Sequence, residues 1–141
     1  MDTVLGELIR ISNTVGKDKT LVLGNFGNTS VKSEDGAEMV IKASGVELAA
    51  VSQEHGWRRV RVADVLELLN DKTLAKSGDA ERTVRIEAGL LLACRDHQPA
   101  TVQPSIETFF HALLDTVVIH LHPEAVLAAA CAGNGQKVVA K

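Results

Sequence analysis

Residues 116–131 constrain the fold more than any other part of the chain, because they join a strand directly to a helix. Residues 116–121 are rich in β-branched side chains, which predicts a strand. Pro123 suits a first helical position and Glu124 places an acid in the first turn, so a helix is predicted up to Cys131. A strand that passes at once into a helix indicates a layered fold with helices packed on a sheet.

Other segments supply the remaining elements of that fold. Helical apolar spacing predicts helices over residues 3–15, 64–69, 84–94 and 106–114, and the helix over 84–94 is expected to be buried. Short apolar runs predict strands over residues 20–23, 29–33, 39–42 and 57–62, the last at a sheet edge. A hairpin turn is expected at residues 34–36, and residues 136–141 are expected to be irregular. The class is α/β or α+β.

The composition excludes several classes of function. The formal net charge is -3, and the chain has three Phe, one Trp and no Tyr, so we expect no nucleic-acid partner. No stretch reaches the roughly 20 apolar residues of a membrane span, so we expect no membrane partner. The N-terminus lacks a basic region followed by an apolar one, which predicts a cytoplasmic protein.

A pair of histidines, His120 and His122, ends the strand predicted over residues 116–121. Alternate side chains of a strand share a face, and two residues rise by about 6.6 Å. Two imidazoles at that separation can reach one metal, since Zn–N bonds measure about 2.0–2.1 Å. Open α/β sheets also place ligands at the C-terminal ends of their strands. The alternative is a pair of core or surface histidines without a ligand role.

The second candidate is the run Pro104-Ser105-Ile106-Glu107, with His111 one helical turn later. Ser105 can cap the helix predicted over 106–114, and a carboxylate is favoured in a first turn. If this helix start faces the metal, Glu107 becomes a candidate general acid/base and His111 a residue that supports a metal ligand. A purely structural role for both is the alternative.

The third candidate comprises two turns rich in small residues, at positions 24–30 and 42–45. Gly and Asn permit positive φ, and successive backbone N–H groups in such turns can cradle an anion such as phosphate. The Gly-Lys-Ser/Thr step of a P-loop is missing. A plain hairpin connection is the alternative.

Together these pieces resemble the class II aldolase/adducin family, which includes fuculose- and rhamnulose-phosphate aldolases. The likeness consists of four runs in order: Gly27-Asn28-Thr29-Ser30, Lys42-Ala43-Ser44-Gly45, Pro104-Ser105-Ile106-Glu107 and His120-Leu121-His122-Pro123. The first run also looks like the aldolase half of bifunctional aldolase/dehydrogenase proteins. The resemblance implies an α/β fold of three layers, α/β/α, with a mixed, mostly antiparallel sheet.

The resemblance also implies roles for the residues. His120 and His122 would bind Zn²⁺ or another divalent metal, Glu107 would be the catalytic acid/base, and the substrate phosphate would be held by Asn28, Ser44, Gly45 and Ser105. The implied reaction is cleavage of a ketose 1-phosphate, a small-molecule sugar phosphate, through a zinc-stabilised enediolate. The alternatives are a non-catalytic, adducin-like assembly module and a related sugar-phosphate epimerase or dehydratase.

The resemblance runs from about residue 5 to the end of the chain. Whole domains of this type are longer, so we expect a single domain over residues 1–141 that is cut short at its C-terminal end. The family takes a third His from a later strand, but no His follows His122 here. The metal would then need a carboxylate, a water or an outside group, and Glu107 is one candidate. Family enzymes are ring-shaped tetramers, which implies a homo-oligomer.

Overall fold

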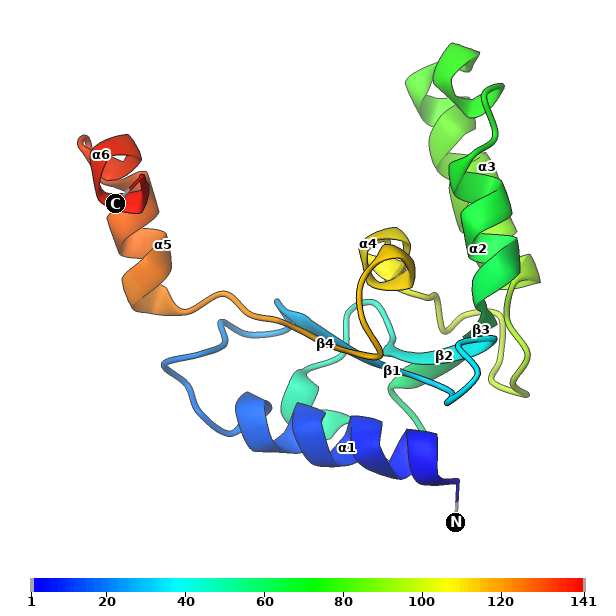
Figure 1. The fold of residues 1–141 in the computed structure, drawn as a ribbon, viewed down its shortest axis with the longest axis horizontal. Coiled ribbons are helices and arrows are strands. Elements are labelled where there is room, and N and C mark those ends of the chain that lie inside the picture. The colour runs from blue at the N-terminus through cyan, green and yellow to red at the C-terminus, as the bar shows by residue number, and fades with distance from the viewer. Residues whose placement is uncertain (1, 141) are drawn as a thin grey trace.

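The computed structural model describes residues 2–140 (Figure 1). Its helices are α1 (Thr3–Gly16), α2 (Val62–Leu69), α3 (Asp79–Leu92), α4 (Thr108–Leu113), α5 (Glu124–Cys131) and α6 (Gly135–Val139). Its strands are β1 (Asn28–Lys32), β2 (Glu38–Lys42), β3 (Trp57–Arg61) and β4 (Val117–His120). Two short 3₁₀ turns, η1 (Leu48–Ala50) and η2 (Leu74–Lys76), complete the list.

The four strands form one sheet in the order β3-β2-β1-β4, and each neighbouring pair is antiparallel. The hairpin between β1 and β2 is therefore confirmed, as is the edge position of β3. In the β1–β4 pair, Asn28 lies opposite His120 and Ser30 lies opposite Val118. Because directly opposed residues of an antiparallel pair share a face, this register places Asn28 and His120 on the same side of the sheet.

Helices cover both faces of this sheet, which confirms the predicted α/β fold (Figure 1). On one face, α1 packs Leu8 against Val31 and Val40 of the central strands. On the other face, Met39, Ile41 and Val60 pack in one cluster with residues of the three following helices, namely Val65, Leu90 and Ala112. The alternation of Met39, Val40 and Ile41 between the two clusters follows from the two-residue period of a strand.

Helix α1 forms where the sequence predicts it, because its N-terminal cap and its apolar face both favour a helix over the same residues. The side chain of Asp2 accepts hydrogen bonds from the N–H groups of Val4 and Leu5 at 3.1 and 3.3 Å. Leu8 is fully buried on the sheet-facing side. A buried bond of 2.6 Å between Ser12 Oγ and Thr29 Oγ1 then fixes the helix against β1.

Two predicted elements differ in the structure. The strand expected over residues 20–23 is a turn, because Asp18 accepts bonds from both the N–H and the hydroxyl of Thr20 at 2.9 and 2.6 Å. The helix expected to be buried over 84–94 spans Asp79–Leu92 and buries only Leu90 among its residues. It pairs with α2 in a helical hairpin that rises away from the sheet (Figure 1), so most of its surface stays exposed.

The C-terminal segment also departs from expectation. Strand β4 exposes Val117, Ile119 and His120, because it lies at the edge of the sheet; its β-branched residues alone would equally suit a strand inside the sheet. Helix α5 begins at Glu124, with Pro123 at the N-cap and not at the first helical position as predicted, and none of its described residues is buried. The tail expected to be irregular forms α6, and both helices stand beyond the end of β4 (Figure 1). Within residues 2–140, no helix is long and apolar enough to cross a membrane.

Candidate functional site

The residues predicted to bind phosphate line one pocket, although they come from three distant parts of the chain. A cavity of about 220 Å³ is bordered by Asn28, Ser44, Gly45 and Ser105, and Glu107 lies on the same wall. Asn28 begins β1, the two residues at 44 and 45 follow β2, and Ser105 precedes α4. An isolated β-bridge between Ala43 and Pro104 and a 2.9 Å bond from Ser44 N–H to the Gln103 carbonyl hold the last two segments together.

Gly27 and Gly45 allow these turns to close around the pocket. Their φ angles are 85° and 74°, a region that residues with a Cβ rarely adopt. A Cβ on Gly27 would also lie 2.9 Å from the carbonyl oxygen of His120, at the end of β4. The turn before β1 and the end of β4 therefore contact each other at a point where only glycine fits.

The replacement Gly27→Ala tests this contact. We expect the free energy of unfolding to fall by about 1–3 kcal/mol, because the methyl group adds both left-handed strain and overlap with β4. Gly6→Ala is the matched control: Gly6 lies within α1 with no heavy atom within 4 Å of an added Cβ, so we expect a gain of about 0.5–1 kcal/mol. Urea denaturation measures the stability of both variants. Equal stabilities of the two variants would contradict the close approach of Gly27 to the end of β4.

Glu107 connects the pocket to His120. It occupies the N-cap position of α4 without a side-chain capping hydrogen bond, and the helix starts at Thr108, two residues after the predicted start at Ile106. Ser105 lies two residues before this position, so its predicted role as the cap is wrong. Its Oγ accepts from the N–H of Glu107 at 3.3 Å, and its carbonyl accepts from that of Thr108 at 3.0 Å. Oε2 of Glu107 lies 3.2 Å from Nδ1 of His120.

His111 is a third member of this cluster. This residue of α4 is buried, and its Nδ1 shares a 2.7 Å hydrogen bond with Ser30 Oγ on β1. One ligand atom each from Glu107, His111 and His120 lie within 4.8 Å of one another. The sequence placed His111 one turn after Glu107 but could not show that both side chains point to the same strand end.

Two buried polar atoms in this cluster favour a bound cation. Among residues 2–140, neither Glu107 Oε2 nor His111 Nε2 has a hydrogen-bond partner; the 3.2 Å approach to His120 lacks hydrogen-bond geometry. A buried polar atom left in this state costs about 1–3 kcal/mol. Imidazole nitrogen and carboxylate oxygen are the ligand types that Zn²⁺ uses in proteins. The donor set therefore fits a divalent metal.

Burial of His111 predicts a pH dependence of stability. Desolvation lowers the pKa of its imidazole to about 4, partly offset by the charge of Glu107. In the unfolded chain the pKa is about 6.5, so between these values the unfolded state binds more protons than the folded state. Above pH 6.5, we therefore expect the titration of His111 to leave the free energy of unfolding unchanged. As the pH falls from 6.5 towards 4, we expect this titration to lower the free energy of unfolding.

Urea denaturation of the metal-free protein at pH 7 and pH 5 measures this effect. The variant His111→Gln should lose part of the difference between the two pH values, whereas His55→Gln, at an exposed loop position, should keep it. An unchanged pH dependence in His111→Gln would show that His111 is not the buried neutral group.

His122 lies next to His120 but beyond the end of β4. The two rings are 4.8 Å apart between centroids, and the ring of His122 is 5.6 Å from that of Phe26. In the described part of the chain, the three-residue cluster that could hold a metal includes His120 and not His122. The two rings are thus near neighbours, as predicted from the strand, while the ligand role of His122 remains a prediction.

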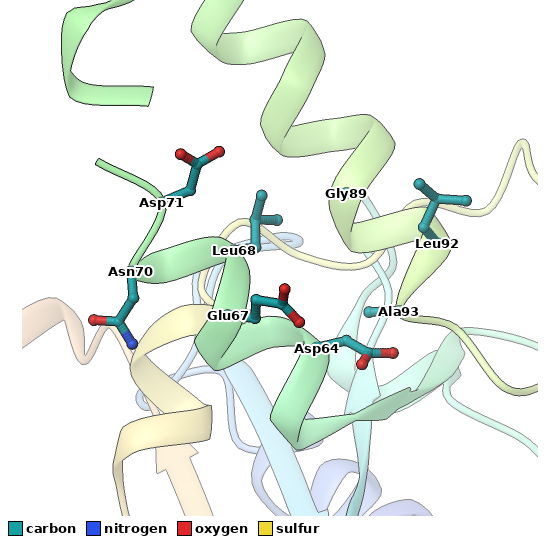
Figure 2. Close-up of a pocket in the computed structure, with 8 residues that line it drawn as sticks. All are labelled: Asp64, Glu67, Leu68, Asn70, Asp71, Gly89, Leu92 and Ala93. Carbon is teal, nitrogen blue, oxygen red and sulfur yellow. The ribbon is translucent and has the colours of Figure 1, made fainter. Parts of the chain in front are cut away.

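A second, larger pocket lies away from these residues. It has a volume of about 600 Å³ between α2 and α3 and is lined by Asp64, Glu67, Leu68, Asn70, Asp71, Gly89, Leu92 and Ala93 (Figure 2). Two of its carboxylates are already paired, Asp64 with Arg61 and Arg95, and Asp71 with Arg85. Salt bridges to arginine leave these oxygens less available as metal ligands than those of the β4 cluster.

The antiparallel sheet with helices on both faces matches the fold of a class II aldolase domain. A family model described as "Class II Aldolase and Adducin N-terminal domain" matches residues 6–140. This chain therefore belongs to the class II aldolase/adducin family, as the sequence motifs predicted.

The chain is also similar to a solved structure and to a curated protein. The chain matches the "Structure of the N-terminal Class II Aldolase domain of a conserved protein from Thermoplasma acidophilum" with a TM-score of 0.75 and 28% identity, over 99% of this chain and 64% of that one. It is 30% identical over 140 residues to the "Uncharacterized oxidoreductase YuxG" of Bacillus subtilis (strain 168). That alignment covers 94% of this chain and 19% of the relative, so the chain spans about a fifth of that protein.

Proposed function

We propose that this domain is a metal-dependent sugar-phosphate aldolase that cleaves a ketose 1-phosphate. One observation carries the proposal: four separate segments meet so that a pocket lined by Asn28, Ser44 and Ser105 ends at Glu107, beside His120. The pocket offers hydroxyl and amide donors for a phosphate. The cluster offers imidazole and carboxylate ligands for a cation a short distance away.

The metal would be held by His120, with Glu107, His111 and the adjacent His122 as further candidate ligands. A bound divalent metal supplies a Lewis acid that stabilises negative charge on substrate oxygens. Ser30 holds the ring of His111 by its Nδ1, so that Nε2 is the nitrogen directed away from this bond. This orientation is the role that outer hydrogen bonds play for metal-binding histidines.

Glu107 is the candidate acid/base because it lines the pocket and lies beside His120 at the same time. Its carboxylate can hold a proton at Oε2, the oxygen that lacks a hydrogen-bond partner within the described residues. A general acid/base must lie within hydrogen-bond reach of the substrate atom that it serves. A sugar phosphate anchored at Ser44, Gly45 and Ser105 would have its carbon chain next to this oxygen.

An assembly role is the second candidate, because the edge of the sheet is exposed and apolar. Val117 and Ile119 of β4 are 44% and 45% exposed, and Leu113 and Leu114 next to them are 63% and 55% exposed. An apolar sheet edge of this kind favours pairing with another chain. A homo-oligomer, with or without catalysis, would cover this surface. A sugar-phosphate epimerase or dehydratase would use the same metal and pocket.

The relative from Bacillus subtilis is called an oxidoreductase, and this chain matches only 19% of it. We infer that the matched part supplies aldolase-type chemistry and that any oxidation belongs to the remainder of such proteins.

Metal analysis of the purified chain, followed by cleavage assays with ketose 1-phosphates, tests the proposal. We expect about one zinc per chain and the release of dihydroxyacetone phosphate, which a chelator should abolish. Stoichiometric metal without cleavage would favour the epimerase or assembly role. A chain that binds no divalent metal would contradict the proposed function.

A further inference from the structure

Phe26, in the turn before β1, is an aromatic residue on the wall of the candidate pocket, and it is 57% exposed. The residues that line this cavity are otherwise polar, charged or glycine, apart from Ile106, which is also exposed. Ligand pockets typically combine apolar walls with a few polar groups that fix the orientation of the ligand. Phe26 therefore supplies an apolar surface to a cavity that is mainly polar.

The ring of Phe26 also contacts the histidines at the end of β4. Its centroid lies 5.6 Å from that of His122, whose own ring lies 4.8 Å from that of His120. Phe26 thus borders the cavity and the histidine pair at the same time. Glu107 makes the same connection with a carboxylate. A ligand that extends from the cavity to His120 therefore meets one polar group and one aromatic ring.

Hydrogen bonds hold the turn that carries Phe26 in place. The N–H of Phe26 donates to the carbonyl of Leu23 at 3.0 Å. The buried side chain of Lys42 donates from Nζ to the carbonyl of Asn25 at 3.4 Å. The backbone on the N-terminal side of the ring is thus tied to β2, which makes the ring a defined part of the pocket wall.

Leu23, at the start of the same turn, provides the comparison. It is also 57% exposed, but it does not border the cavity. The two side chains share an apolar character, a turn and a degree of exposure. They differ in that Phe26 lies against the pocket and the histidine pair.

We propose that Phe26 is a specificity-determining residue, whose exposed ring contacts the carbon chain of a ligand that extends from the cavity to the histidine pair. The inference rests on the proposed function and adds the part of the ligand on which this contact acts. An aromatic face removes apolar C–H groups from water, whereas a charged group placed against it would lose its hydration without a partner. The ring therefore favours an uncharged carbon chain at this point.

Calorimetric titration of the zinc-loaded full chain with dihydroxyacetone phosphate and, separately, with inorganic phosphate tests the inference. For Phe26→Ala we expect the affinity for dihydroxyacetone phosphate to fall about fivefold or more, because the apolar contact is lost. Inorganic phosphate has no carbon chain, so its affinity should change less than about twofold in the same variant. Leu23→Ala should leave both affinities within about twofold of the original values.

Three results would overturn the inference and leave the proposed function standing. The first is an unchanged affinity of Phe26→Ala for dihydroxyacetone phosphate. The second is an equal loss for both compounds, which would indicate an effect on the turn and not on the carbon chain. The third is a loss of zinc from Phe26→Ala, because the ring would then act through His122. An original protein that binds neither compound would instead count against the proposed function and the inference together.

A second measurement needs no variant. The chain has three Phe, and rings labelled with ¹³C give each of them its own NMR signal. Added dihydroxyacetone phosphate should shift the signal of Phe26 and leave that of Phe110 in place, because Phe110 is exposed on α4 and does not border the cavity. A Phe26 signal that stays fixed while dihydroxyacetone phosphate binds would overturn the assignment.

Discussion

Replacing His120 with alanine is expected to weaken zinc binding by about 100-fold or more. His120 belongs to the three-residue cluster and lies beside both Glu107 and the ring of His122, so its loss removes the central ligand. Changes even in groups that only support a ligand cost about 10- to 100-fold in metal affinity. Competition titration with a zinc chelator of known affinity measures the effect.

The control for this experiment is His97→Ala. His97 is an exposed loop residue that borders a different pocket, together with Trp57 and Arg59. Its replacement should leave zinc affinity unchanged. If His120→Ala kept stoichiometric, tight zinc, His120 would be removed from the set of ligands and the candidate metal centre would have to lie elsewhere.

Replacing Glu107 with glutamine is expected to lower the kcat of ketose 1-phosphate cleavage by about 10²- to 10⁴-fold, the usual contribution of a positioned acid/base. The amide has nearly the same shape as the carboxylate but cannot take up the proton. Phosphate affinity should change little, because the donors at Ser44, Gly45 and Ser105 are retained. Steady-state kinetics together with phosphate titration separate the two effects.

Glu87→Gln is the matched control for Glu107→Gln. Glu87 lines an adjoining cavity of about 370 Å³, which shares Ser44, Ser105 and Ile106 with the candidate site. Glu87 belongs to α3, and Glu107 is not among the residues that line this second cavity. This variant should keep its kcat within about twofold, as expected for a change outside the reacting groups. Equal losses in both variants would indicate a general effect of charge and not acid/base catalysis by Glu107.

The sequence predicted those parts of the fold in which local pattern and tertiary packing agree. Helix α1 has a capping Asp2 and apolar residues on one face, and its bounds came out within about a residue. The prediction of a strand over residues 20–23 was wrong, because the Asp18 side chain supports a turn there. The exposure of β4 could not be read from its β-branched residues, since the same pattern suits a buried strand or a sheet edge.

The candidate site was predictable as a set of residues but not as a geometry. The motifs indicated that Asn28 and His120 belong to one site, whereas their placement opposite each other depends on the register of β1 and β4. The contribution of His111 depends on its bond to Ser30, a residue 81 positions away in sequence. The burial of Lys42 could not be predicted, because burial of a lysine follows from packing and not from local sequence.

Crystals of the full chain soaked with zinc, with data collected on both sides of the zinc absorption edge, test the central claim most directly. We predict one strong anomalous peak within bonding distance of His120, in the cluster that it forms with Glu107 and His111, next to the pocket lined by Asn28 and Ser105. The account would be contradicted by a peak confined to the carboxylates between α2 and α3, or by a map without a peak at His120 although the crystals contain zinc.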